Sequence, residues 1–380
     1  MSRAPTKGVR ASLAGRRIAV CVGPGGVGKT TVAAAVGLGA AVEGARVLVC
    51  TIDPARRLAN ALGLSSLGNV ESRVPEHKFS EAGVRPRGAL FAMMLDVKRT
   101  WDDLVSRHAP DPVRRDRILQ NRLYQQMSAA LAGSQEYMAM EKLYELDTDR
   151  DYDLIVLDTP PTAHALDFLE APDRILDFLG NDTARVLLAP AVGAGRIGFR
   201  LAQLGSGYLA KALARFTGQQ ALADLGEFLH GFHDMYEGFK ARAAAVRALL
   251  SRPEVGFVLV TSPSPTAMEE ALAFHRRLAA ERMPVAGLVV NRLTSPLWTE
   301  PGPLPAPEAL EGPLAAARLS APGRAERLAG ALADHDALAA AEARAMGRLL
   351  AEVTGARSLV PRLAGDVHDL AGLARLAARL

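Results

Sequence analysis

The chain has 380 residues and a mass of 40.3 kDa, with 49% hydrophobic and 23% charged residues. This balance is typical of a folded globular protein and excludes a largely disordered chain. The formal net charge is only +4, and no basic segment is interleaved with aromatic residues, so we expect no nucleic-acid partner. No apolar run reaches the length of a membrane span and no apolar signal segment begins the chain, which predicts a cytoplasmic protein.

Strand-like and helix-like segments alternate along the chain. The run 17–22 predicts a buried strand that ends in a glycine turn, and 30–43 predicts a helix with Gly44 as its C-cap. A surface loop is expected over 294–323, because this segment is rich in Pro and Gly. The remaining predictions are strands at 46–51, 90–95, 154–157, 255–261, 285–290 and 358–360, a helix over 266–281, a long Ala/Leu helix after 323, and a terminal helix over 367–380.

The glycine turn at residues 23–30 reads GPGGVGKT and fits the P-loop pattern G-x-x-x-x-G-K-[ST]. Glycines allow successive backbone N–H groups to turn toward phosphate oxygens, and the helix that follows directs its N-terminus at the anion. A glycine turn with an unrelated lysine is the alternative, but a buried strand before it and a helix after it favour a phosphate site. The predicted ATP-binding residues here are Gly25, Gly26, Val27, Gly28, Lys29, Thr30 and Thr31, with Thr30 also a ligand of Mg²⁺.

The motif and the alternation together predict an α/β fold of the P-loop NTPase class, a mostly parallel twisted sheet flanked by helices. Two helical blocks fall between sheet strands and are expected to form an inserted α-helical subdomain. The predicted division is a disordered basic leader at 1–16, a nucleotide-binding core at 17–96, 151–163 and 251–380, and the helical subdomain at 97–150 and 164–250.

Two aspartates follow predicted strands, where ligands gather at the carboxyl edge of a parallel sheet. Asp158 follows a hydrophobic strand, a pattern that indicates a carboxylate holding Mg²⁺ through water, although such an aspartate can also form a turn. Asp53 precedes Pro54. It fits equally well a helix N-cap and a carboxylate that orients the attacking water.

Five segments resemble motifs of the ArsA/Get ATPase family, which includes the arsenite-pump ATPase and the ATPase that delivers tail-anchored membrane proteins. The resemblance covers almost the whole chain and implies an ATP-hydrolysing switch whose nucleotide state opens and closes a helical subdomain that engages a protein or membrane-associated client. The segments are 24–31 (PGGVGKTT, P-loop), 53–55 (DPA, switch I), 158–166 (DTPPTAHAL, switch II), 289–293 (VVNRL, adenine site) and 360–367 (VPRLAGDV, last strand and turn).

The resemblance also implies roles for individual residues. With Lys29, Asp53 would be catalytic and would position or deprotonate the attacking water, and Asp158 would sense Mg²⁺. His164 would transmit the switch state, unless it is an ordinary histidine at a helix start. At the base, Asn291 would read the adenine edge, unless it is a strand-end turn residue, and Pro361 would pack nearby.

The sequence departs from the family at three places. Pro24 stands where the family has a signature lysine that reaches a dimer partner's phosphates, and Arg56-Arg57 stands where switch I usually has His-Ser. Hydrolysis could therefore be slow, Arg56 or Arg57 could substitute, or a lysine-bearing paralogue could complete the site in a heterodimer; we favour the paralogue. The two cysteines, Cys21 and Cys50, lie in strand-like runs, so no metalloid or zinc site is expected.

Other functions remain open from the sequence. A ParA/MinD-like ATPase on a nucleoid or membrane surface has a similar P-loop but lacks long helical insertions, and Pro24 also fits a low-turnover nucleotide-binding subunit. The oligomer could be a homodimer or a heterodimer. Met127, Met138 and Met140 could line an apolar groove for a hydrophobic client, although methionines at helical spacing are more often core.

Overall fold

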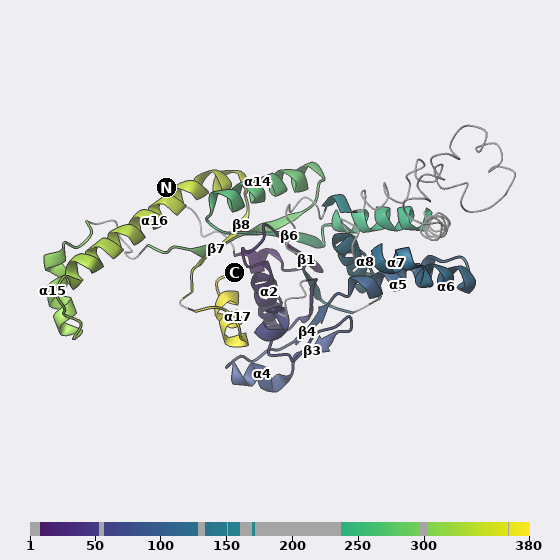
Figure 1. Ribbon diagram of the computed structural model, residues 1–380, viewed down its shortest axis with the longest axis horizontal. Helices are drawn as coiled ribbons and strands as arrows, with labels where there is room; N and C mark the ends of the chain where they lie inside the picture. Colours follow the sequence, from purple (N-terminus) through teal and green to yellow (C-terminus); the bar gives the residue numbers. More distant parts are fainter. Residues whose placement is uncertain are drawn as a thin grey trace, which may run out of the picture.

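The centre of the molecule is an eight-stranded sheet in the order β3-β4-β2-β5-β1-β6-β7-β8 (Figure 1). The computed structural model describes residues 8–52, 57–127, 134–149, 151–159, 169–171, 237–296, 303–363 and 365–380. Every neighbouring pair of strands is parallel except β3 and β4, which are antiparallel. The predicted α/β architecture, a mostly parallel sheet flanked by helices, is therefore confirmed.

The strands begin and end close to their predicted limits, because most are apolar runs buried on both faces. β1, β5 and β6 are buried along their whole length, and β7 extends past the prediction to include Asn291. The polar two-residue strand β3 had no hydrophobic pattern to predict it. The strands are β1 (Ile18–Val22), β2 (Arg46–Thr51), β3 (Ser72–Arg73), β4 (Ala89–Met94), β5 (Leu154–Asp158), β6 (Val255–Thr261), β7 (Val285–Leu293) and β8 (Ala356–Pro361).

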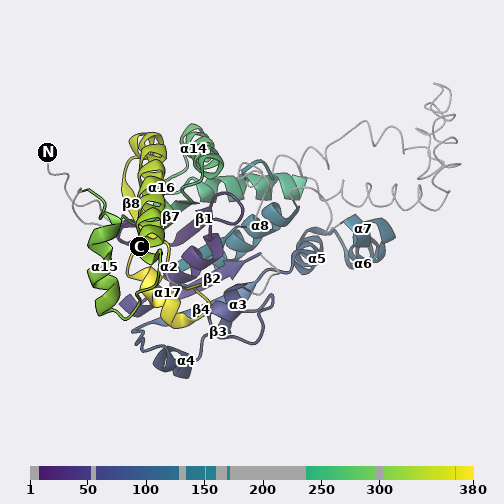
Figure 2. The same cartoon turned by 60° about the vertical axis from the view of Figure 1, so that its left-hand side comes forward.

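Helices cover both faces of the sheet (Figure 2). The predicted cap of the helix after the P-loop is confirmed, because Gly44 adopts the left-handed conformation that ends α2. Residues 237–250 are also helical. The helices are α1 (Val9–Ser12), α2 (Lys29–Glu43), α3 (Arg57–Ala61), α4 (Glu76–Glu81), α5 (Val97–His108), α6 (Pro112–Gln120), α7 (Arg122–Met127), α8 (Ser134–Asp149), α14 (Pro265–Ala280), α15 (Pro307–Ala316), α16 (Arg324–Glu352) and α17 (Leu370–Ala377).

The hydrophobic core has two layers, one on each face of the sheet. Successive residues of β1 point to opposite layers. Ala19 and Cys21 face the layer of α2 and α17. Val20 faces the layer formed by α8, residues 237–250 and α14. None of the helices in the described residues combines the length and apolar content needed to cross a membrane.

The prediction of a disordered leader at 1–16 is wrong for residues 8–16. Val9 is fully buried, and its N–H donates to Ser358 Oγ at 3.1 Å. Arg10 Nη1 donates to the carbonyl of Ala377 at 2.8 Å, near the end of α17. The charge pattern suggested a solvated segment. In the structure, Arg10 and Arg16 instead donate hydrogen bonds to backbone carbonyls of residues distant in sequence.

The predicted loop over 294–323 contains a helix, α15. Pro307 occupies its first turn, where a proline costs no hydrogen bond, so the residue that suggested a loop in fact begins a helix. In Figure 1, α15 lies beside the end of the long helix α16 that extends away from the sheet.

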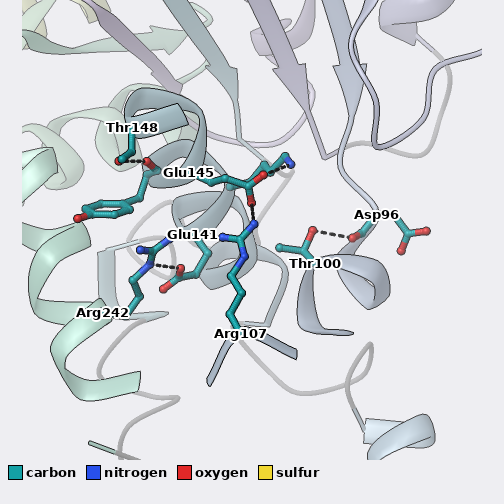
Figure 3. Close-up of polar contacts among 9 residues, drawn as sticks. Asp96, Thr100, Arg107, Glu141, Glu145, Thr148 and Arg242 are labelled. Atoms are coloured by element: carbon teal, nitrogen blue, oxygen red, sulfur yellow. Dashed lines mark hydrogen bonds and ion pairs between the residues drawn. The ribbon is translucent and has the colours of Figure 1, made fainter. Parts of the chain in front are cut away.

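The described part of the helical blocks is held by an ion pair between a buried carboxylate and a partly buried arginine (Figure 3). Glu141 on α8 is 3% exposed, and it accepts hydrogen bonds from Arg242 Nε at 2.7 Å and from the Tyr137 hydroxyl at 2.8 Å. Burial raises the pKa of the Glu141 carboxyl, and the Arg242 guanidinium opposes this rise. Nearby, Trp101 of α5 packs against Phe239 with ring centroids 6.0 Å apart. α5 and α8 are thereby joined to residues 237–250.

The methionines of this region are core residues where they are described. Met138 and Met140 are fully buried, which favours the core interpretation over a client groove. The side chain of Met127 and residues 172–236 lie outside the described residues. The strands come from the predicted core segments and α5–α8 from the first helical block, but the division into core and helical subdomain stays a prediction.

We predict that Arg242→Ala lowers the free energy of unfolding by about 3 kcal/mol, because it leaves the Glu141 carboxylate buried without its cation. Urea denaturation measures this change. The control is Arg277→Ala on α14, whose exposed pair with Glu281 at 3.0 Å is worth less than about 0.5 kcal/mol. Equal losses in the two variants would contradict the structural role of the buried pair.

Candidate functional site

The P-loop lies at the carboxyl end of the central strand β1, between β5 and β6. Gly23 has φ 150°, and a Cβ there would lie 1.9 Å from the carbonyl oxygen of Val260 on β6. Gly28 has φ 97°, and a Cβ there would lie 2.5 Å from Asn291 Nδ2. Both positions require glycine because the left-handed backbone and the close neighbours leave no room for a side chain.

The Lys29 side chain folds back over the loop. It is 6% exposed, and its ammonium donates to the carbonyls of Gly23 and Pro24, both at 2.9 Å. Thr30 and Thr31 follow in the first turn of α2 and are partly exposed. The structure therefore places a positive charge and a helix N-terminus at the same turn, an arrangement that attracts an anion.

Two neighbouring side chains from β7 contact the outer side of the loop. Asn291 Nδ2 donates to the carbonyl of Val27 at 2.8 Å, and Arg292 Nη1 donates to the carbonyl of Gly26 at 2.9 Å. The predicted adenine residue is thus beside the P-loop. In this structure its amide nitrogen is bonded to the loop backbone, and its adenine role stays a prediction.

Asp158 ends β5, in register with Cys21 on β1 and Thr51 on β2. It is 1% exposed, and its Oδ2 accepts a hydrogen bond from Thr51 Oγ1 at 2.8 Å. The next residue, Thr159, donates through its hydroxyl to the carbonyl of Cys21 at 2.8 Å. The carboxylate is therefore held directly beside the strand that leads into the P-loop.

Burial and nearby charges shift the pKa of both cysteine thiols. Burial is the largest cause that raises the pKa of the Cys21 thiol, the nearby Asp158 carboxylate raises it further, and Lys29 lowers it. Burial likewise raises the pKa of Cys50 to about 12, against an opposing effect of Lys142. Cys21 and Cys50 are buried on opposite faces of the sheet, so they cannot contribute to one metal site.

Of the remaining residues predicted for the site or for the switches, the structure describes Pro361 and Arg57. Pro361 ends β8, is partly exposed and pairs with Leu293, so it lies at the same edge of the sheet as Asn291. Arg57 is exposed and begins α3. Asp53, Arg56 and His164 lie outside the described residues, and their roles stay predictions.

Two contacts of this site were not predicted from the sequence, those of Thr51 with Asp158 and of Arg292 with the P-loop. Thr51 is a polar residue at the end of an otherwise apolar strand, which is a weak signal of a site at the sheet edge. Arg292 follows Asn291 directly, but only the left-handed backbone at Arg292, with φ 63°, directs its side chain to the loop.

A cavity of about 680 Å³ lies at the opposite, amino edge of the strands. It is lined in part by Arg10, Arg16 and Arg17. The Arg16 guanidinium donates to the carbonyl of Pro253 at 2.8 Å, and Arg10 pairs with Glu43 and the Ala377 carbonyl. Arg10 and Arg16 bond to distant parts of the fold, so the P-loop edge is the better candidate site.

We predict that neither cysteine reacts with a thiol reagent in the folded protein at pH 8. At a pKa of about 12, only about one Cys50 thiol in ten thousand is ionised at that pH, and burial also blocks access. Titration with an aromatic disulfide should detect both thiols only after denaturation in guanidinium. Rapid modification of the native protein would contradict the burial of Cys21 and Cys50.

Comparison with known proteins agrees with this geometry. Residues 16–297 match the family model described as anion-transporting ATPase. The chain is 28% identical over 186 residues to ATPase GET3 of Rhodotorula glutinis (48% of this chain, 47% of that protein). It is 28% identical over 305 residues to an uncharacterized protein of Streptomyces coelicolor (80% and 67%), and 25% identical over 281 residues to ATPase get3 of Neurospora crassa (74% and 73%).

These alignments differ in how much of each relative they cover. The chain spans about half the length of the Rhodotorula protein that it matches, and larger shares of the Streptomyces and Neurospora proteins. The family model covers about three quarters of the chain and includes the P-loop, Asp158 and the Asn291-Arg292 segment. The chain belongs to the anion-transporting (ArsA) ATPase family, whose members bind ATP.

Proposed function

We propose that the chain binds ATP with Mg²⁺ on the P-loop and hydrolyses it. The observation that carries this proposal is the arrangement of residues 23–31, where the buried Lys29 ammonium lies at the N-terminus of α2. A polyphosphate is the ligand that such a loop fits best, because it offers several oxygens to the backbone N–H groups and the lysine together. Lys29 would bind the β- and γ-phosphates and stabilise the charge that develops between them.

The oxygen groups at the sheet edge fit a magnesium ion. Thr30 has a hydroxyl in the first turn of α2, and Asp158 has a carboxylate fixed by Thr51. Hard oxygen donors of this kind suit Mg²⁺, which retains much of its water in phosphate sites. Thr30 would bind the ion directly and Asp158 through water, and the bound ion would neutralise charge on the phosphates. In the same proposal, Asp53 positions or deprotonates the attacking water.

We propose further that the nucleotide state controls the helical subdomain. α5–α8 connect β4 to β5, and β5 ends at Asp158, so the chain returns from these helices directly into the site. Cys50 of β2 lies in the same buried apolar layer as residues of α8, which supports close packing of α8 against this part of the sheet. Inserted helices of this length favour an ArsA/Get-type switch over a ParA/MinD-like protein. A dimer, a hydrophobic or membrane-protein client and a cytoplasmic location belong to this proposal.

Pro24 supports a second candidate, a subunit with low turnover that works in a heterodimer. Pro24 is buried and contributes neither a side-chain charge nor an N–H group to the loop. A charge placed near the transferred phosphate strongly affects the rate of phosphoryl transfer. In this case a lysine-bearing paralogue would supply the missing cation, while this chain binds nucleotide and contributes the second half of the dimer.

We predict that Lys29→Ala weakens the binding of MgATP at least about a hundredfold, because the loop loses the only side-chain cation that its sequence motif provides. Equilibrium binding of a fluorescent ATP analogue measures this, with Lys78→Ala on α4, a partly exposed lysine that pairs with Glu81, as the control. Circular dichroism should show that both variants stay folded. Tight, Mg²⁺-dependent binding by folded Lys29→Ala protein would refute the proposed site.

We predict that Pro24→Lys raises single-turnover hydrolysis by the isolated chain about tenfold, because it supplies a cation at the start of the loop. The control is Pro24→Ala, which removes the ring without adding charge. Fast turnover by the unmodified chain alone, or equal rates in the two variants, would exclude the second candidate as we describe it.

A further inference from the structure

The P-loop is held from outside by two consecutive residues of β7. Asn291 and Arg292 donate hydrogen bonds to two consecutive carbonyls of the loop, those of Val27 and Gly26. The Asn291 side chain is itself oriented, since its Oδ1 accepts the N–H of Arg292 at 3.0 Å. Its amide nitrogen is thereby turned toward the loop.

The backbone at Arg292 is unusual for a residue with a side chain. Its φ of 63° lies in the left-handed region, which costs a non-glycine residue of the order of 1 kcal/mol. This conformation turns the chain at the end of β7 so that the exposed guanidinium reaches Gly26. Glycine would avoid the strain but would lose this hydrogen bond.

The planarity of the peptide bond converts these contacts into an effect on N–H groups. In a trans peptide the C=O and the N–H point in opposite directions. The carbonyl of Gly26 shares its peptide plane with the N–H of Val27, and the carbonyl of Val27 shares its plane with the N–H of Gly28; none of the described peptide bonds is cis. Fixing the two carbonyls therefore fixes the directions of two N–H groups in the middle of the P-loop.

The close packing at Gly28 shows that this contact is built into the site. A Cβ on Gly28 would lie 2.5 Å from Asn291 Nδ2, so the loop and the amide occupy adjoining space with no gap between them. The next loop carbonyl, that of Gly28, accepts the N–H of Val32 at 3.0 Å in α2. Three successive carbonyls are thus bonded to donors from β7 and α2.

We propose that Asn291 and Arg292 are positioning residues that hold the N–H groups of Val27 and Gly28 in the direction that receives a polyphosphate. The proposal rests on the proposed function, and it assigns Asn291 a role toward the phosphates in addition to the adenine role that the family resemblance implies. Preorganised donors bind better because no free energy is then required to order them at the moment of binding. The positive charge of Arg292 beside the loop also favours an anion.

The experiment compares Asn291→Ala and Arg292→Ala with Arg282→Ala. Arg282 is a matched control, because it is an exposed arginine with φ 57° just before the opposite end of the same strand. Two ligands are titrated in the presence of Mg²⁺, a fluorescent ATP analogue and inorganic triphosphate, which has no base. Amide ¹⁵N relaxation of Val27 and Gly28 is measured in the protein without nucleotide.

We expect both β7 variants to weaken ATP and inorganic triphosphate about tenfold, with Arg292→Lys restoring most of the affinity. The order parameters of the Val27 and Gly28 amides should fall from about 0.85 to below about 0.7, whereas Arg282→Ala should leave them unchanged. Thermal melts establish that the variants are folded.

Three results overturn the proposal. One is unchanged order parameters in Asn291→Ala and Arg292→Ala. Another is an affinity for inorganic triphosphate within twofold of that of Arg282→Ala. The third is an Asn291→Ala variant that loses affinity for ATP alone, because Asn291 would then act only on the base. If the unmodified protein binds neither ligand, the proposed function fails, while the relaxation data still decide whether the two side chains fix the loop.

Discussion

The proposed nucleotide site depends on how one turn satisfies its backbone carbonyls. Between β1 and α2 the turn would present N–H groups to an anion, and the carbonyls on the other side of the same peptide planes need donors. Lys29 provides them for Gly23 and Pro24, Arg292 for Gly26 and Asn291 for Val27. The loop is therefore shaped by contacts to its own lysine and to β7.

The position of β1 explains why these donors are available. β1 lies between β5 and β6, and β7 lies next to β6, so the carboxyl ends of four adjacent strands gather around the P-loop. β5 contributes Asp158, β7 contributes Asn291 and Arg292, and β6 presents the Val260 carbonyl that restricts position 23 to glycine. Parallel strands place all of these ends at one edge, which is why ligands bind there in this class of sheet.

The helices between β4 and β5 are tied to one another and to the helix at 237–250, before β6, by charges that are costly to bury. Glu141 and Arg242 join α8 to the helix at 237–250 (Figure 3). The Tyr137 hydroxyl provides a second donor to the carboxylate. Glu145 of α8 also pairs with Arg107 of α5 at 2.9 Å. Directional contacts of this kind favour one arrangement of the helices over others, and this makes them suitable for a subdomain that changes position as a unit.

In the proposed function, Pro24 bears on the rate of hydrolysis and not on nucleotide binding. The contacts that shape the loop do not require a side-chain charge at position 24, since Pro24 contributes its carbonyl to Lys29. Phosphoryl transfer has a different requirement, because charge develops on the phosphates in the transition state. The proline is therefore compatible with a well-formed binding site. Its missing charge would affect only the rate of phosphoryl transfer.

Local sequence patterns were sufficient for much of the fold and for the P-loop. Buried apolar runs placed most strands correctly, and Gly44 ended α2 as expected, because these features depend on residues close together in the chain. The motif at 23–30 and the aspartate at the end of β5 were readable for the same reason. The pattern failed at β3, which is too short and polar to show a period, and at α15, where Pro307 begins a helix.

Other features were decided only by contacts between distant residues. The segment 8–16 is ordered by Ser358, Ala377 and Leu380, none of which its own basic composition reveals. The buried pair of Glu141 and Arg242 joins residues 101 positions apart. Arg292 reaches Gly26 across 266 positions through a left-handed backbone that no propensity predicts. The sequence by itself determined the sheet and the phosphate loop, whereas the donors that fix the loop depended on which strands became neighbours, a property of the whole fold.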